Sequence, residues 1–156
     1  MTAVTLEAIE AKQTELANLI AKFKSETTNP VLWTYSEVQI ALLPGERYAG
    51  AVLDAKGHVS HNLVLMAPRP EAKLNWKDAM DWAESIGGSL PNRQEQALLY
   101  ANCKPHLKPE WHWSSETHAV ETSYAWGCNF DDGSQYYDDK SYEGCAVAVR
   151  LIPLTA

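Results

Sequence analysis

The chain has 156 residues, of which 46% are hydrophobic and 21% charged, and its formal net charge at pH 7 is −7. This is the size and composition of one soluble globular domain, or of one domain with an appendage. The negative charge argues against general binding to nucleic acid or to an anionic membrane, because both need a surplus of lysine and arginine. No apolar run approaches the ~20 residues of a transmembrane helix, so we also expect no membrane insertion.

The first residues, Met1 to Glu7, lack a basic start followed by an apolar core, which predicts that there is no secretory signal and that the chain is made in the cytoplasm. The chain has three cysteines, Cys103, Cys128 and Cys145, an odd number that forms no framework of disulfide pairs. Because intracellular disulfides are rare, we interpret them as reduced thiols. A Cys128–Cys145 disulfide remains an alternative, because both residues flank the same loop region. No Cys-x-x-Cys or His-x-x-x-His pair accompanies them, so we predict no metal site and no cofactor.

The first predicted element is a helix from Leu6 to about Lys24. Residues at alternating steps of three and four form a seam of the coiled-coil type, which we call the α-seam: Leu6, Ile9, Gln13, Leu16, Ile20 and Phe23. An isolated helix of this length is marginal in water, so the α-seam must be buried. It either joins copies of the chain in a short parallel coiled coil, with Gln13 setting the register, or packs on its own domain.

We therefore predict a stem and hinge over residues 1–30 and a folded domain over residues 31–156. Ser25 to Pro30 is polar and ends in a helix-stopping proline. Val31 to Leu42 alternates loosely between apolar and polar residues, as an extended connector or edge strand would.

The domain begins with a predicted β-hairpin and two helices. Strands Arg47–Leu53 and Asn62–Met66 flank a glycine-containing loop, which is typical of a hairpin. Helices are predicted at Trp76–Ile86 and from Arg93 to about Asn102. Asn75 and Asn92 are their N-caps, and Gly87-Gly88 ends the first.

Three further strands are predicted at Trp111–Ser114, Tyr124–Phe130 and Ala146–Ile152, and the turn Asp131-Asp132-Gly133 leads into Gln135–Tyr137. From Trp111 to Arg150, aromatic, amide and carboxylate residues are crowded together without helical periodicity. A disordered loop would not carry so many rings, and a core strand would not need so much polar chemistry. We interpret this stretch as short strands and ordered loops that present a binding face.

Several motifs together carry a resemblance to a known family: Gly87-Gly88-Ser89-Leu90-Pro91-Asn92-Arg93-Gln94-Glu95, Trp111-His112-Trp113-Ser114-Ser115 and Ala148-Val149-Arg150. Residues 44–154 resemble the bacterial and prophage domain family related to the C-terminal domain of the Legionella collagen-like protein. The resemblance implies an α+β, C-type-lectin-like fold with two helices and small mixed antiparallel sheets. Here the N-terminal helix would precede it.

The resemblance also implies a setting in phage tails or bacterial adhesins, which are often trimeric. We therefore expect a non-enzymatic receptor-binding or adhesin module at a tail-fibre tip, made in the host cytoplasm and carried in the virion as a homo-oligomer, with a trimer favoured. Its partner would be a cell-surface glycan or a protein receptor. One alternative is a virion structural or assembly protein that docks another phage tail protein. Another is a cysteine-dependent enzyme related to the formylglycine-generating enzymes, although the surroundings of Cys128 and Cys145 do not resemble that active site.

The candidate ligand-binding residues combine flat rings with directional polar groups. The rings are Trp126, Tyr136, Tyr137 and Tyr142, and the polar groups are His112, Glu116, Asn129, Asp132, Gln135 and Lys140. The competing interpretation is that strand rings, Trp126 among them, are core, since one face of each strand must be buried. We assign mainly scaffold roles to Trp76, Trp82, Trp111, Trp113, Phe130 and Val147–Arg150.

Two kinds of chemistry are disfavoured. Ser114 and Ser115 lie near His112 and His118, as a nucleophile and base would, but hydrogen-bonded strand residues explain them better. Asn129 and the aspartates after it offer oxygen ligands for calcium. The chain lacks the Glu-Pro-Asn, Gln-Pro-Asp and Trp-Asn-Asp motifs of sugar-binding C-type lectins, so we interpret Asp131-Asp132-Gly133 as a turn.

Overall fold

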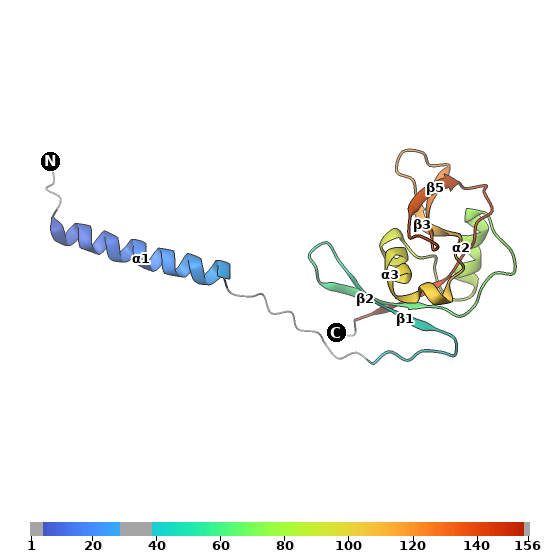
Figure 1. Cartoon of the computed structure of the whole chain (residues 1–156), viewed down its shortest axis with the longest axis horizontal. Coiled ribbons are helices and arrows are strands. Elements are labelled where there is room, and N and C mark those ends of the chain that lie inside the picture. Colours follow the sequence, from blue (N-terminus) through green and yellow to red (C-terminus); the bar gives the residue numbers. More distant parts are fainter. Residues whose placement is uncertain (1–4, 29–38, 155–156) are drawn as a thin grey trace. The chain divides into compact units, whose positions relative to one another are not determined.

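The computed structural model describes residues 5–28 and 39–154. The chain divides into two compact units, residues 1–37 and 38–156 (Figure 1). The predicted boundary between residues 30 and 31, the last two residues of the predicted hinge and most of the Val31–Leu42 connector lie outside the described residues.

The first unit contains helix α1 (Leu6–Thr28), which confirms the predicted helix and continues it by about one turn. Every apolar side chain of the α-seam is exposed, from 45% for Ile20 to 72% for Leu6. Lys12 and Glu15 form an exposed ion pair of 2.8 Å along the helix, and such pairs contribute little stability. The apolar stripe of the helix is therefore largely exposed to solvent.

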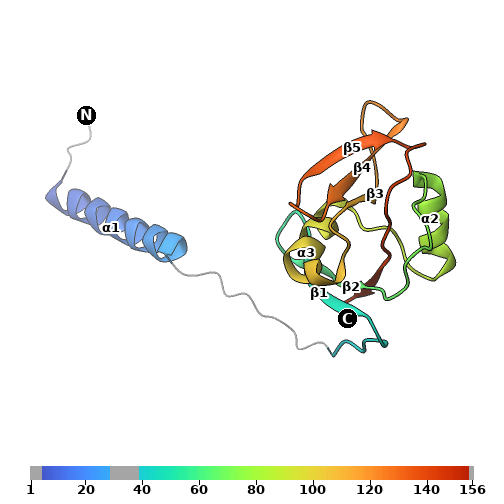
Figure 2. The same ribbon diagram turned by 45° about the vertical axis from the view of Figure 1, so that its right-hand side comes forward.

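The second unit is an α+β domain with two three-stranded antiparallel sheets, which confirms the predicted class. One sheet has the order β1-β2-β6, formed by β1 (Arg47–Leu53), β2 (Val59–Leu65) and β6 (Val149–Pro153). The other has the order β3-β4-β5, formed by β3 (Trp111–Thr117), β4 (Tyr124–Asn129) and β5 (Gln135–Asp139). Helices α2 (Trp76–Ser85) and α3 (Arg93–Cys103), with the 3₁₀ turn η1 (Lys104–His106), complete it. In Figure 2, α2 and α3 stand on either side of the domain, between the two sheets.

The first sheet joins the two ends of the domain. The predicted hairpin is confirmed as β1 and β2, and β6 adds to β2 with Arg150 opposite Val64. Residues 146–148, predicted as part of the last strand, are buried but form no ladder, and the strand begins at Val149. Arg150 Nη2 lies 2.6 Å from Oε2 of Glu46, a carboxylate that is only 3% exposed. Hydrogen bonding to Arg150 lowers the pKa of Glu46. The ion pair links strand β6 to the segment that precedes β1.

The helix caps follow local sequence chemistry. Asn75 accepts a hydrogen bond from the backbone N–H of Asp78, and Gly87, with φ of +80°, follows the end of α2. Asn92 and Glu95 form a capping box at the start of α3. The predicted caps at both helix N-termini are thus confirmed.

The core has two parts. One lies among α3, the first sheet and β4, and contains Leu63, Leu65, Leu99, Phe130 and Val147 among others. The other packs α2 against Trp111 and Trp113 of β3. Trp113 is 0% exposed and its Nε1 donates to Leu74 O at 2.8 Å, so its predicted scaffold role is confirmed. Gly127 gives Trp111 room, because a Cβ there would lie 2.3 Å from the indole ring.

Candidate binding site

The register of sheet β3-β4-β5 divides the predicted site residues between two faces. Trp126 lies opposite Tyr137 and Cys128 opposite Gln135, whereas Gly127 lies opposite Tyr136. Residues directly opposite each other in an antiparallel pair point to the same face, and neighbours along a strand point to opposite faces. Trp126, Gln135 and Tyr137 therefore share one face and Tyr136 lies on the other. We call the face with Trp126 the Arg93 face, because Arg93 packs on that ring, and we call the other the Tyr136 face.

The Arg93 face is built around the first residue of α3. The guanidinium carbon of Arg93 lies 3.7 Å from the ring centroid of Trp126, in cation–π geometry. Arg93 Nε donates to Gln135 Oε1 at 3.1 Å, and Gln135 Nε2 donates in return to Arg93 O at 2.7 Å. The arginine side chain is thus held by β4 and β5 together.

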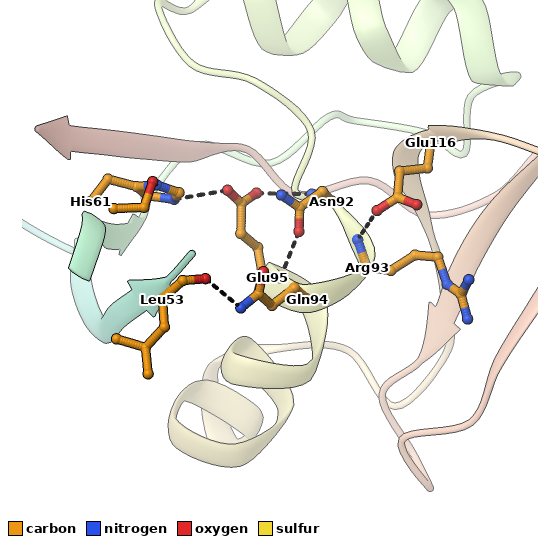
Figure 3. Close-up of polar contacts among 8 residues, drawn as sticks. Leu53, His61, Asn92, Arg93, Gln94, Glu95 and Glu116 are labelled. Carbon is orange, nitrogen blue, oxygen red and sulfur yellow. Dashed lines mark hydrogen bonds and ion pairs between the residues drawn. The ribbon is translucent and has the colours of Figure 1, made fainter. Parts of the chain in front are cut away.

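Glu116 connects β3 to the same helix end. Its Oε1 accepts a hydrogen bond of 2.8 Å from the backbone N–H of Arg93 (Figure 3). A carboxylate is favourable there, since the first N–H groups of a helix have no partner within the helix and its N-terminus carries a partial positive charge. Glu116, predicted as a ligand-binding residue, therefore has a helix-capping contact and fixes the position of Arg93.

The N-terminus of α3 is also bonded to the first sheet. Oε1 of Glu95, a residue only 3% exposed, lies 3.0 Å from Nε2 of His61 on β2, and its Oε2 accepts from Asn92 N. Gln94 Nε2 donates to Leu53 O at the end of β1. Figure 3 shows these contacts on one side of the helix end and Arg93 extending to the other. Because α3 is tied to both sheets, Arg93 projects from a rigid base.

Aromatic rings continue the Arg93 face beyond Trp126. The ring of Tyr137 lies 5.1 Å from Trp126 and 4.3 Å from His118, and Tyr124 approaches it edge-on at 5.7 Å. Tyr137 is 45% exposed, so this cluster opens to solvent. The rings offer apolar surface beside the polar atoms of Arg93 and Gln135, a combination suited to recognition.

The Tyr136 face carries three of the predicted residues away from this site. Tyr136 stacks on Trp111 at 5.7 Å, and Tyr142 meets the same indole edge-on at 5.7 Å. Lys140 Nζ lies 4.2 Å from the ring centroid of Trp76 on α2. Tyr136 and Tyr142 are half-exposed over a tryptophan that is 8% exposed. This face is consequently the outer layer of the α2–β3 core.

Asn129 and Asp132 belong to the β4–β5 turn. Asn129 Oδ1 accepts from the backbone N–H of Asp131, and Asp132 Oδ1 accepts from both N and Oγ of Ser134, at 2.9 and 2.7 Å. The bonds from Ser134 lower the pKa of Asp132. The amide oxygen of Asn129 and the carboxylate of Asp132 thus stabilise the turn. Within residues 5–28 and 39–154, no three His, Cys, Asp or Glu residues gather in a way that could hold a metal ion.

The placement predicted for His112 is wrong. Its side chain lies in the core, 2% exposed, where Nδ1 donates to Glu110 O at 2.8 Å and the ring packs 4.8 Å from Phe130. Burial lowers the pKa of His112 to about 4, so the ring is neutral at pH 7. His112 therefore presents nothing to a ligand at the surface.

Three of the residues considered for catalysis, Ser114, Cys128 and Cys145, are also buried. All three cysteines are free and buried, and burial raises the pKa of each, that of Cys128 to about 11. The thiols are protonated at pH 7, whereas a nucleophilic cysteine needs its thiolate. Ser114 is buried, and its Oγ accepts a hydrogen bond from Glu116 N.

No protein-family model matches the sequence, and no curated protein matches it significantly. In the part of the chain that the structure describes, none of the helices has the length and apolar character needed to cross a membrane. Function is therefore inferred from the residues and their geometry.

Proposed function

We propose that the chain is a non-enzymatic receptor-binding module of a phage or prophage tail fibre. It binds a cell-surface glycan or protein receptor through the Arg93 face. It is made in the host cytoplasm and carried in the virion tail. The observation that supports this most is the Arg93 face itself, where a rigidly held arginine adjoins half-exposed aromatic rings.

The C-type-lectin-like fold is part of this proposal. Two helices and two small antiparallel sheets agree with the arrangement that the family resemblance implies. The residues of the resembling motif also have consistent local roles: Gly87 follows the end of α2, Leu90 and Pro91 are buried, and Asn92 with Glu95 caps α3. The motif thus explains how the chain positions Arg93.

Helix α1 supplies the oligomer in this proposal. Burial of apolar side chains drives association, and the α-seam is exposed along its whole length. Packing copies of α1 in a parallel coiled coil, as a trimer, covers the α-seam. An oligomer presents several identical Arg93 faces, so weak individual sites gain avidity on a surface with repeated receptors.

The test uses the full chain in two measurements. Light scattering after size exclusion should give a homo-oligomer, and a labelled sample should bind saturably to some strains in a panel of bacterial cells. Ile9→Glu and Ile20→Glu together place charges in the α-seam, so this double variant should be monomeric and bind cells more weakly. A wild-type monomer that binds no strain would contradict the proposal.

A second candidate function is a virion structural or assembly protein that docks another tail protein. The Tyr136 face favours it, because Tyr136 and Tyr142 offer half-exposed rings over a buried tryptophan, and aromatic anchors are common in protein interfaces. Antibody labelling of intact purified particles separates the two functions. A receptor-binding module is accessible at the tail tip, whereas a docked assembly protein is covered.

A further inference from the structure

Arg93 differs from the other arginines of the chain in what its terminal nitrogens bind. Arg150 Nη2 pairs with Glu46, Arg69 donates from both Nη atoms to backbone carbonyls, and Arg47 Nη1 donates to Glu46 O. Among the described residues, the Arg93 side chain donates only through Nε, to Gln135. Within residues 5–28 and 39–154, neither Nη atom of Arg93 has a hydrogen-bond acceptor, and no carboxylate oxygen lies within 4.0 Å of its guanidinium nitrogens.

The free end of Arg93 is nevertheless fixed in place. The indole of Trp126 covers one face of the guanidinium, Gln135 holds its Nε, and Glu116 holds its backbone N–H. A planar guanidinium can donate two parallel hydrogen bonds to the two oxygens of a carboxylate. A group already held in one geometry also loses less conformational entropy when it binds a ligand. Arg93 is thus arranged as an anion receptor rather than as a structural ion pair.

We propose that Arg93 is the specificity-determining residue of the binding site, and that the site takes an acidic saccharide whose carboxylate bonds both Nη atoms of Arg93. This deepens the proposed receptor-binding function and rests on it. The sugar ring lies against Tyr137, which is 45% exposed and lies 5.1 Å from Trp126. Aromatic rings offer an apolar face with a polar tip, which suits the C–H face of a sugar next to its polar groups.

The net charge of the chain bears on how a ligand carboxylate is recognised. With a net charge of −7, the chain as a whole repels anions, so a bound carboxylate must be selected by local geometry rather than by general attraction. The Glu116 carboxylate already lies at the N-terminus of α3 and offsets the positive potential there. The guanidinium alone therefore discriminates acid from neutral sugar, and each single site is weak.

The experiment compares saccharides that differ only in the carboxylate. The full chain is titrated with oligosaccharides that end in glucuronic acid or in sialic acid, each beside its carboxyl-reduced, neutral counterpart. Wild type should bind one of the acidic sugars at least about tenfold more tightly than its neutral counterpart, the lower end of what a hydrogen bond between charged groups contributes. Arg93→Gln should remove that difference. Arg93→Lys should retain only part of it, because an ammonium group keeps the charge but not the planar pair of donors.

A matched control removes a similar cation elsewhere. Lys104 Nζ lies 4.7 Å from the ring centroid of Tyr100, so Lys104→Gln also removes one positive charge from an aromatic ring. It should leave the acid preference unchanged. Thermal melting of each variant verifies that the domain is folded, and Arg93→Lys keeps the test valid if Arg93→Gln is unstable.

The outcomes distinguish this inference from the proposed function. Equal binding of acidic and neutral saccharides by wild type, an acid preference that survives in Arg93→Gln, or no binding of any acidic saccharide overturns the inference. If the chain still binds cells in any of these cases, the receptor-binding proposal stands without it. If cell binding is also absent, both fail.

Discussion

The two faces of sheet β3-β4-β5 carry similar residues in different roles. On the Tyr136 face, tyrosines lie directly on Trp111, so their rings extend the core. On the Arg93 face, polar contacts between Arg93 and Gln135 hold a cation against Trp126, and the rings continue outward to Tyr137. The first arrangement stabilises the domain, and the second leaves hydrogen-bond donors at the surface. Aromatic density alone therefore does not locate a binding site.

The largest expected effect concerns the buried layer beneath the Arg93 face. Its His112 has a pKa lowered from 6.5 to about 4. Since the unfolded chain binds the proton more readily, this group's contribution to stability is complete above pH 6.5. It is lost as the pH falls toward 4, by about 3 kcal/mol. Chemical denaturation at several pH values should show a steeper loss between pH 6.5 and 4 in wild type than in His112→Gln. Parallel curves would show that His112 is not buried as described.

The next prediction concerns the base of the Tyr136 face. Gly127→Ala places a Cβ 2.3 Å from Trp111 and 2.5 Å from His112 O, so the indole must move and Tyr136 loses its stacking partner. Overpacking of this kind costs about 1–3 kcal/mol. Urea denaturation at pH 7.5 measures it, and Thr122→Ala in the exposed β3–β4 loop is the control. An unchanged free energy of unfolding for Gly127→Ala would mean that Trp111 is not packed against β4.

A smaller effect tests the base that positions Arg93. Glu95→Ala removes the reciprocal half of the capping box and the partner of His61, at a cost of about 1–2 kcal/mol. Lys77→Ala on the exposed side of α2 should have much less effect, since exposed ion pairs are weak. Denaturation curves at pH 7.5 measure the free energy of unfolding of both variants. Equal destabilisation would remove the special role given to the N-terminus of α3.

Local sequence chemistry predicted most of the secondary structure. Asn75 and Asn92 were identifiable as caps and the hairpin strands by their flanking glycine loop, because these signals depend on neighbouring residues only. The division of the two faces was also within reach. Tyr136 and Tyr137 are consecutive in a strand and must point to opposite sides, which argues against the prediction that both belong to one binding surface.

Other features depended on tertiary packing. The run from Trp111 to Ser114 is buried on both sides, so strand alternation could not show that His112 and Trp113 both lie in the core. From the sequence, Arg93 is predicted only as the first residue of a helix. Its role depends on Trp126 and Gln135, which lie on strands 33 and 42 residues further along the chain. No local pattern marks that convergence.

Two neighbouring substitutions test whether the Arg93 face, and not the Tyr136 face, binds the receptor. Tyr137→Ala and Tyr136→Ala each remove one ring of similar exposure, 45% and 44%, from opposite faces of β5. In saturation binding of the full chain to receptor-bearing cells, Tyr137→Ala should weaken the affinity about tenfold or more, as for an interface anchor. Tyr136→Ala should leave it within about twofold of wild type. Weakened binding by Tyr136→Ala, with Tyr137→Ala unchanged, would contradict the account.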